Sequence, residues 1–167
     1  TSPDNLVFTR QISIDENFLF TIEDTVANKT TETQILQQYA RIRRTGTPET
    51  SGFCILHEGP IGVLKQTLLE LDYDDLLEKT ETKQSTGGWI GITDKYWLAA
   101  LVPNQKSEIT GTFKSIIKNN KKMYEVNYTS SLFEIPPKKE IKIVSNLFIG
   151  AKEVSLLDSY SKKLSIE

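Results

Sequence analysis

The run TGGWIGITDKYWLAALVP, residues 86–103, is the most apolar stretch of the chain and contains both of its tryptophans. A glycine pair precedes the apolar part and Pro103 closes it, so both ends carry residues that interrupt regular structure. Charged residues occur only in the middle, at Asp94 and Lys95. This pattern predicts two short strands joined by a tight turn and buried too deeply to alternate between polar and apolar residues.

The segments before this run predict further antiparallel strands. Residues 6–14 and 18–27 each alternate between apolar and polar residues, which predicts a hairpin with one wet face. Residues 33–44 have a Gln and Ala content that a helix would accept, but their position after a hairpin and their lack of a capping box favour a strand. The rest predicts a loop over 45–52, a buried strand over 53–56, a turn at Gly59-Pro60, a strand over 61–65, a helical turn over 74–78 and a polar connection over 79–88.

The segments after the run predict a second hairpin, a break and a last strand. The hairpin is the clearest of these, because residues 107–118 alternate cleanly and Asn119-Asn120 suits the left-handed backbone of a tight turn. In order, we expect a return strand with Tyr124, Val126 and Tyr128 facing inward, its extension to Ile135, a break at Pro136-Pro137 and a strand over 140–149.

The period of the apolar residues changes after Gly150. Over residues 152–166 they recur at spacings of three and four, which predicts one amphipathic helix. We therefore expect an all-β fold with a C-terminal helix: nine or ten antiparallel strands forming a sandwich over residues 1–150, with the helix, over 151–167, in the same domain. The helix carries the candidate partner-contact residues Val154, Leu157, Tyr160 and Leu164.

Composition limits the partners. The 167 residues suffice for one domain, and a formal net charge of −2 with only small basic clusters argues against a nucleic-acid surface. Cys54 is the one cysteine, and its apolar neighbours predict a buried, unreactive thiol. The sequence contains no run of about 18 apolar residues, so it predicts no membrane span within the chain. We expect the chain to be a segment of a longer protein, so the absence of a span describes this segment and not necessarily the parent protein.

The residues offer no catalytic constellation. His57 is the single histidine and fits a structural role at a strand end, and no spacing of Cys and His suits a metal. The acidic run over 72–75 lacks the glycine and the distal glutamate of a calcium loop. Gly87-Gly88 precedes a strand rather than the helix that a phosphate loop needs. We therefore expect no catalytic residue, cofactor or metal, and the patterns alone indicate a binding or scaffold module.

Two segments resemble signature motifs of a known family. Residues 87–103 resemble the GGW…D-K-Y-W/F…A…P signature in the periplasmic domain of YidC-type membrane protein insertases of Gram-negative bacteria. Residues 146–153 resemble the L-F/Y-x-G-P-K segment before that family's next membrane span, with Ala151 in place of the usual Pro, which is acceptable at a helix start. The matching residues, for which we expect structural roles, are Gly87, Gly88, Trp89, Asp94, Tyr96, Trp97, Pro103, Leu147, Phe148 and Gly150.

The resemblance implies a β-supersandwich with mutarotase-like topology, here partial because the family's domain starts well before residue 1. It also implies a non-catalytic domain on the periplasmic side of the bacterial inner membrane, within an insertase and chaperone that folds inner-membrane proteins alone or beside the Sec translocon. The implied partners are translocon components and nascent membrane proteins, and docking is the role we expect for this domain. A sheet edge left open in the chain predicts self-association.

Two other hypotheses remain open. A carbohydrate- or peptide-binding module would use the sandwich cleft, with Trp89 and Trp97 stacking on the ligand, although their apolar surroundings favour burial in the core. A mutarotase-like enzyme is less well supported, because that fold usually works with several histidines and acids and this chain has one histidine.

Overall fold

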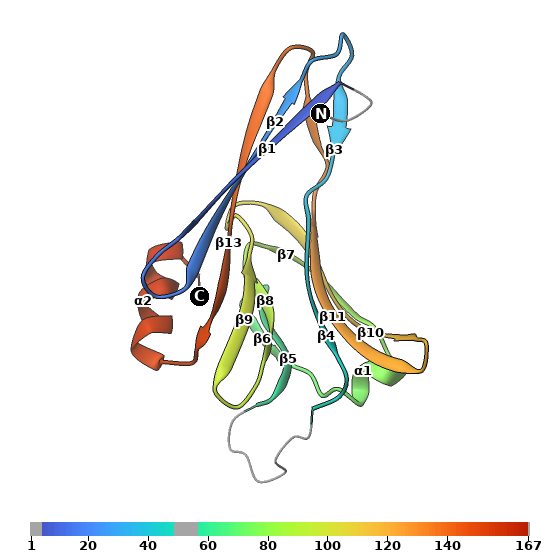
Figure 1. The fold of residues 1–167 in the computed structure, drawn as a ribbon, viewed down its shortest axis with the longest axis vertical. Helices are drawn as coiled ribbons and strands as arrows, with labels where there is room; N and C mark the ends of the chain where they lie inside the picture. Colours follow the sequence, from blue (N-terminus) through green and yellow to red (C-terminus); the bar gives the residue numbers. More distant parts are fainter. Residues whose placement is uncertain (1–4, 49–56, 167) are drawn as a thin grey trace.

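A computed structural model describes residues 5–48 and 57–166 of the chain. Within these ranges it contains thirteen strands and two helices, α1 (Asp75–Glu78) and α2 (Val154–Leu164) (Figure 1). The strands are β1 (Leu6–Ile14), β2 (Leu19–Asn28), β3 (Gln34–Leu36), β4 (Tyr39–Thr45), β5 (Gly59–Leu64), β6 (Thr67–Glu70), β7 (Glu81–Thr86), β8 (Trp89–Thr93), β9 (Trp97–Val102), β10 (Glu108–Lys118), β11 (Lys121–Ser130), β12 (Phe133–Ile135) and β13 (Glu140–Ala151).

Two antiparallel sheets face each other and form a sandwich. The larger sheet has the order β1-β2-β13-β9-β8-β5-β6 and the smaller one β4-β11-β10-β7, while β12 and β3 pair in a short ribbon of their own. The predicted hairpin over residues 86–103 is confirmed as β8 and β9, which pair with each other in the middle of the larger sheet. This hairpin therefore presents one face to the smaller sheet and the other to the outside.

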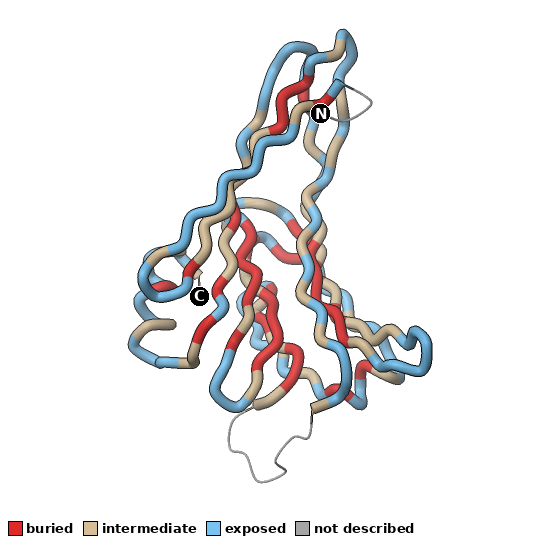
Figure 2. Tube along the Cα trace, viewed as in Figure 1, coloured by how far each residue is buried: buried red, intermediate tan, exposed pale blue. Residues whose placement is uncertain are grey.

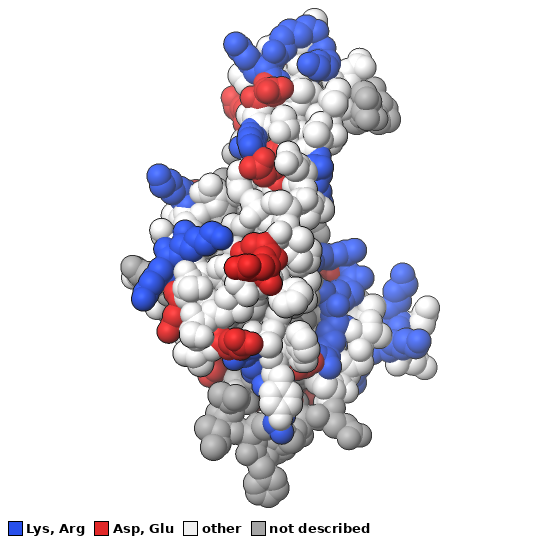
Figure 3. All heavy atoms as spheres, turned by 60° about the vertical axis from the view of Figure 1, so that its left-hand side comes forward, with Lys and Arg blue, Asp and Glu red and all other residues white. Residues whose placement is uncertain are grey.

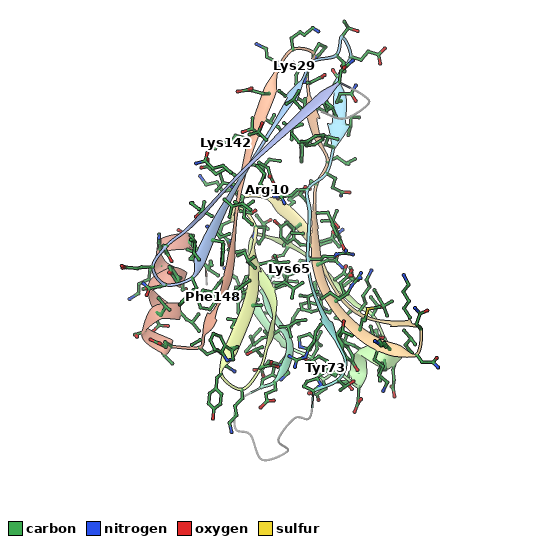
Figure 4. All side chains as sticks on the ribbon, in the orientation of Figure 1. Arg10, Lys29, Lys65, Tyr73, Lys142 and Phe148 are labelled. Carbon is green, nitrogen blue, oxygen red and sulfur yellow. The ribbon has the colours of Figure 1, made fainter. Side chains whose placement is uncertain are left out.

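The main core lies between the inner faces of the two sheets (Figure 2). The register sets Leu147, Leu101 and Ile90 side by side across β13, β9 and β8. From the smaller sheet, Tyr124, Val126 and Tyr128 point inward, as their alternation predicted, and are at most 1% exposed. Leu64, Tyr73, Leu76, Ile92, Ile109 and Phe113 complete the buried cluster, and Tyr73 lies toward the end of the sandwich near α1 (Figure 4).

An arm extends from the sandwich, made of the start of β1, the end of β2 and the first half of β13 on one side and the β3–β12 ribbon on the other (Figure 1). Asn28 joins its two sides: the buried side-chain Nδ2 donates to the carbonyl oxygens of Ile135 and Glu32, each at 2.8 Å. The edge strand β1 keeps apolar side chains in solvent, since Phe8 and Ile12 are 56% and 59% exposed.

The structure corrects two predictions around the smaller elements. The polar connection expected over 79–88 is wrong, because Glu81–Thr86 forms edge strand β7 and pairs with β10. Its side chains are polar, so no apolar alternation marks it, and backbone pairing to β10 decides its conformation. The turn expected at Gly59-Pro60 is also wrong: both residues begin β5, a strand position at which proline is tolerated.

Other boundaries shift as well. Residues 33–44 form strands as expected, but divided into β3 and β4. Ala151 does not start the helix; it ends β13, and α2 begins at Val154. Thirteen described strands replace the nine or ten expected, because short strands such as β3, β6 and β12 carry too few residues for a visible period. The strand expected over 53–56, with Cys54, lies outside the described residues.

Candidate functional site

The outer face of the larger sheet carries a second apolar surface. The register sets Leu19, Phe148, Ala100 and Ile61 in one row across β2, β13, β9 and β5, with Gly91 of β8 between the last two. Helix α2 lies against this side of the sheet, and Phe148 lies on the strand beside it (Figures 1 and 4). A sheet that is apolar on both faces needs cover on both, and α2 supplies it on the outside.

A groove of about 390 Å³ remains between α2 and the sheet. Polar side chains contribute little to it, with Lys152 and Asp158 among the few. Pockets of this size and polarity suit an apolar group or a short apolar peptide segment. Its apolar lining includes Leu19, Ile61, Trp89, Leu98, Phe148, Leu157 and Leu164.

Tyr160 fixes α2 to the body of the protein. Its ring packs on Phe148 with centroids 5.9 Å apart, and its hydroxyl donates to both carboxylate oxygens of Asp15, at 2.7 and 2.8 Å. Burial and this carboxylate raise the pKa of Tyr160 to about 12. Burial pushes the pKa of Asp15 upward, but hydrogen bonds from the Leu19 N–H and from Tyr160 outweigh it and hold that pKa below its ordinary value.

The structure divides the four residues predicted as partner contacts. Tyr160 is buried, and Leu157 and Leu164 are partly buried against the sheet, so these three hold the helix in place. Val154 is 74% exposed at the start of α2 and is the only one of the four that faces solvent. The apolar face of the helix is therefore used within the chain, and a groove remains open beside it.

The two signature glycines let the chain enter the crowded centre of the larger sheet. Gly87 and Gly88 have φ of +65° and +88°, and a Cβ on Gly88 would lie 2.2 Å from the carbonyl oxygen of Val63. The Gln105 amide holds the backbone there, accepting from the Gly88 N–H at 2.9 Å and donating to the Gly88 carbonyl at 3.0 Å. A steric need thus accounts for both glycines.

The other end of the β8–β9 hairpin is exposed. Asp94 accepts a hydrogen bond from Arg44 of β4 at 2.5 Å, which ties the hairpin to the smaller sheet. Beside it, Tyr96 and Trp97 are 65% and 60% exposed. Burial of Trp97 in the core, the favoured expectation, is therefore wrong, because β9 begins at Trp97 on the rim of the sandwich. Trp89 is partly buried, and it packs under α2 rather than between the sheets.

A separate polar pocket of about 650 Å³ lies beside β7 and β10. Its lining is mostly uncharged and polar, and neither tryptophan contributes to it. The stacking role considered for Trp89 and Trp97 therefore has no support in this pocket. The lining residues are Gln37, Lys65, Gln66, Gln84, Ser85, Thr86, Glu108, Ile109, Thr110, Ser130 and Ser131.

Comparison with known protein families shows which family the chain belongs to. The YidC periplasmic domain family matches residues 1–166. The chain belongs to the YidC periplasmic domain family. In the part of the chain that the structure describes, no helix has the length and apolar character needed to cross a membrane.

Similar proteins of known name are membrane protein insertases called YidC. The membrane protein insertase YidC of Rickettsia felis is 40% identical to this chain over 166 residues, and that of Rickettsia bellii is 39% identical; each match covers 98% of the chain and 30% of the relative. The chain thus spans less than a third of these relatives. Among solved structures, it resembles a protein described as an aldose 1-epimerase from Klebsiella pneumoniae, with a TM-score of 0.49 and 10% identity, over 99% of this chain and 52% of that one.

Two residues of this YidC-family chain acquire roles that the sequence did not indicate. Asp15 stands in a polar turn, and no pattern links it to Tyr160, which lies 145 residues further along the chain. Glu125 occupies a solvent-facing position in the alternation of β11, yet only 2% of its side chain is exposed, because Arg43 and Lys114 from the neighbouring strands fold over it. For Glu125, the one hint in the sequence was the basic character of β4, whose arginines lie beside it in the sheet.

Proposed function

We propose that this chain is a non-catalytic periplasmic domain of a membrane protein insertase, and that α2 with the groove beside it docks other parts of the insertion machinery. The observation that supports the proposal is an open apolar groove at a helix fixed by Tyr160 and Asp15, in a member of the YidC periplasmic domain family. A pre-formed apolar groove with a few polar groups at its rim is a common form of protein docking site.

A scaffold role fits the chemistry of the described residues. His57 places Nε2 3.1 Å from the carbonyl oxygen of Pro60, a local structural contact. Among residues 5–48 and 57–166, no cluster of three or more His, Cys, Asp or Glu side chains is arranged to hold a metal ion. Tyr160, whose pKa is strongly raised, has its partner in Asp15 and holds a helix. These groups support structure and recognition rather than bond-making steps.

Membership of the family supports a proposal for the partners. The sandwich of described strands serves as the docking platform, and α2 is the helical element that leads toward the membrane-spanning part of the parent protein. That part inserts and folds inner-membrane proteins, alone or with the Sec translocon. The groove accepts an apolar segment, supplied by a translocon component or by a nascent membrane protein, and this domain orients that partner at the periplasmic side of the inner membrane.

Deletions in the full-length protein test the proposal. Removing residues 152–166 takes away α2 and one wall of the groove, while removing residues 45–52, which the sequence predicts as a loop, leaves both in place. We expect the helix deletion to impair insertion of a reporter membrane protein far more than the loop deletion, in cells that depend on the variant. Equal effects of the two deletions on insertion would contradict a docking role for α2.

The polar pocket favours a second candidate function, binding of a carbohydrate or a peptide backbone. Gln84, Thr86 and Thr110 line it from neighbouring strands, and amides and hydroxyls of this kind suit sugar hydroxyls or peptide groups. A glycan array with wild type and a Gln84→Ala variant separates the candidates. Binding to a glycan that is lost in the folded Gln84→Ala variant would favour the alternative, and an array without binding would favour the groove.

A further inference from the structure

The tip of the β8–β9 hairpin is a rigid, exposed aromatic surface that docking at α2 leaves unused. Tyr96 and Trp97 stand together in solvent, and the Lys95 ammonium lies 5.3 Å from the Tyr96 ring centroid. The backbone beneath them is fixed, because the Asp94 N–H donates to the Trp97 carbonyl at 2.8 Å and the Lys152 N–H to the Tyr96 carbonyl at 2.9 Å. Large exposed aromatic side chains on a fixed backbone indicate a contact surface.

The outer face of the smaller sheet is strongly basic. The register sets its five cations on one face of β4, β11 and β10 together with two carboxylates, of which Glu125 lies among the cations, so this face has a net charge of +3 in a chain whose formal net charge is −2. The other carboxylate of this face, Glu108, lies at the far end of β10. We call these cations the basic face: Arg41, Arg43, Lys114, Lys118 and Lys121.

The aromatic tip and the basic face adjoin. Arg43 and Arg44 line a hollow of about 210 Å³ together with Trp97 and Ile149, and Ile149 is itself 46% exposed. From there the cations continue across β4 to the end of the β10–β11 hairpin, and Figure 3 shows Lys and Arg side chains gathered along the right-hand edge of the lower body. An amphipathic aromatic pair thus borders a broad positive surface.

We propose that this combined surface docks on an anionic phospholipid membrane, with the cations on lipid phosphates and Tyr96 and Trp97 at the headgroup layer. Tyr and Trp prefer this layer because their rings are apolar and their O–H and N–H groups are polar. Cations near an anionic bilayer gain affinity additively. The cations lie on a sheet face, spread over three strands rather than gathered in a cleft, which suits a continuous surface better than a single acidic side chain.

Vesicle binding by the full 167-residue chain tests this inference. We expect co-sedimentation with phosphatidylcholine vesicles that contain phosphatidylglycerol, weak binding to pure phosphatidylcholine, and loss of binding at high salt. Tryptophan emission should shift to the blue on binding. The shift should persist in a Trp89→Phe variant and disappear in a Trp97→Phe variant, because only Trp97 stands in the proposed contact.

Charge variants supply the matched control. The Lys118→Glu/Lys121→Glu pair on the basic face should lower affinity for the anionic vesicles by about tenfold or more. The Lys106→Glu/Lys139→Glu pair makes the same charge change at exposed positions elsewhere and should leave affinity nearly unchanged. Circular dichroism checks that each variant is folded. The inference is overturned if the folded wild type fails to bind, if it binds both vesicle types alike, or if the two charge pairs weaken binding equally.

Discussion

Tyr160 decides where the C-terminal helix lies, through one hydroxyl group on one carboxylate. In a Tyr160→Phe variant the ring still packs on Phe148, but the two hydrogen bonds to Asp15 are lost. We expect a loss of about 1–2 kcal/mol in the free energy of unfolding, at the low end for a bond to a charged group because Asp15 keeps its backbone donors. Urea denaturation measures it. A Tyr96→Phe variant, altered at an exposed ring, should match wild type.

The same pair makes the docking of α2 depend on pH. Folding raises the pKa of Tyr160 to about 12, so its contribution to stability is complete below about 10, the value for an unfolded tyrosine, and is lost as pH rises toward about 12. The lowered pKa of Asp15 adds stability above about 4 that is lost in acid. In Tyr160→Phe the alkaline loss should be smaller than in wild type; an unchanged alkaline profile would count against this anchor.

Glu125 forms ion pairs with three of the five cations of the basic face, Arg41, Arg43 and Lys114. Burial alone would raise its pKa, but hydrogen bonds from Arg43 and the nearby Lys114 ammonium outweigh burial and lower it. A Glu125→Gln variant should lose about 2 kcal/mol of stability, less than for a fully buried pair because the cations are partly exposed. Thermal denaturation beside a control Glu134→Gln variant, altered at an exposed site, measures the loss. Equal midpoints for the two variants would refute this role.

At the scale of elements, the entry to the β8–β9 hairpin depends on Gly88. An alanine there meets two costs, a positive φ and a Cβ 2.2 Å from the Val63 carbonyl oxygen. We expect Gly88→Ala to lose about 3 kcal/mol or more. Gly46 is the matched control: its φ is +82°, but a Cβ there has nothing within 4 Å, so Gly46→Ala should lose only about 1 kcal/mol. Similar losses in the two variants, read from urea midpoints, would mean that crowding at Val63 does not matter.

Elements with a clear period could be predicted from the sequence, and those without one could not. Alternation marked β1, β2, β10 and β11, and the change of period marked α2. Strand β7 carries polar side chains on both faces, so only its backbone pairing with β10 reveals it. The periodicity of α2 found its apolar face but not what the face contacts. Local periodicity cannot predict whether Leu157 and Leu164 contact a partner or the chain's own sheet, because that depends on contacts between residues far apart in the sequence.

At the scale of the whole molecule, edge strand β1 supports the predicted self-association. Among the described residues it has a strand on one side only, and it carries Phe8, Ile12 and Ile14, each more than half exposed. We expect the isolated chain to associate as its concentration rises, and an Ile12→Lys variant to remain monomeric. Light scattering measures the molar mass. An Ile117→Lys control, at an equally exposed site away from β1, should associate like wild type; a wild type that stays monomeric throughout would contradict the prediction.

Crosslinking in cells tests most directly whether the groove beside α2 receives a partner in the full-length insertase. Asp158 is an exposed residue that lines the groove, so we expect a photo-activated amino acid at this position to leave the fold intact. The same group at Thr82, exposed on the smaller sheet, is the control. We expect an adduct from Asp158 with a Sec translocon subunit or a nascent membrane protein, and none from Thr82. No adduct from Asp158, or equal adducts from both positions, would contradict it.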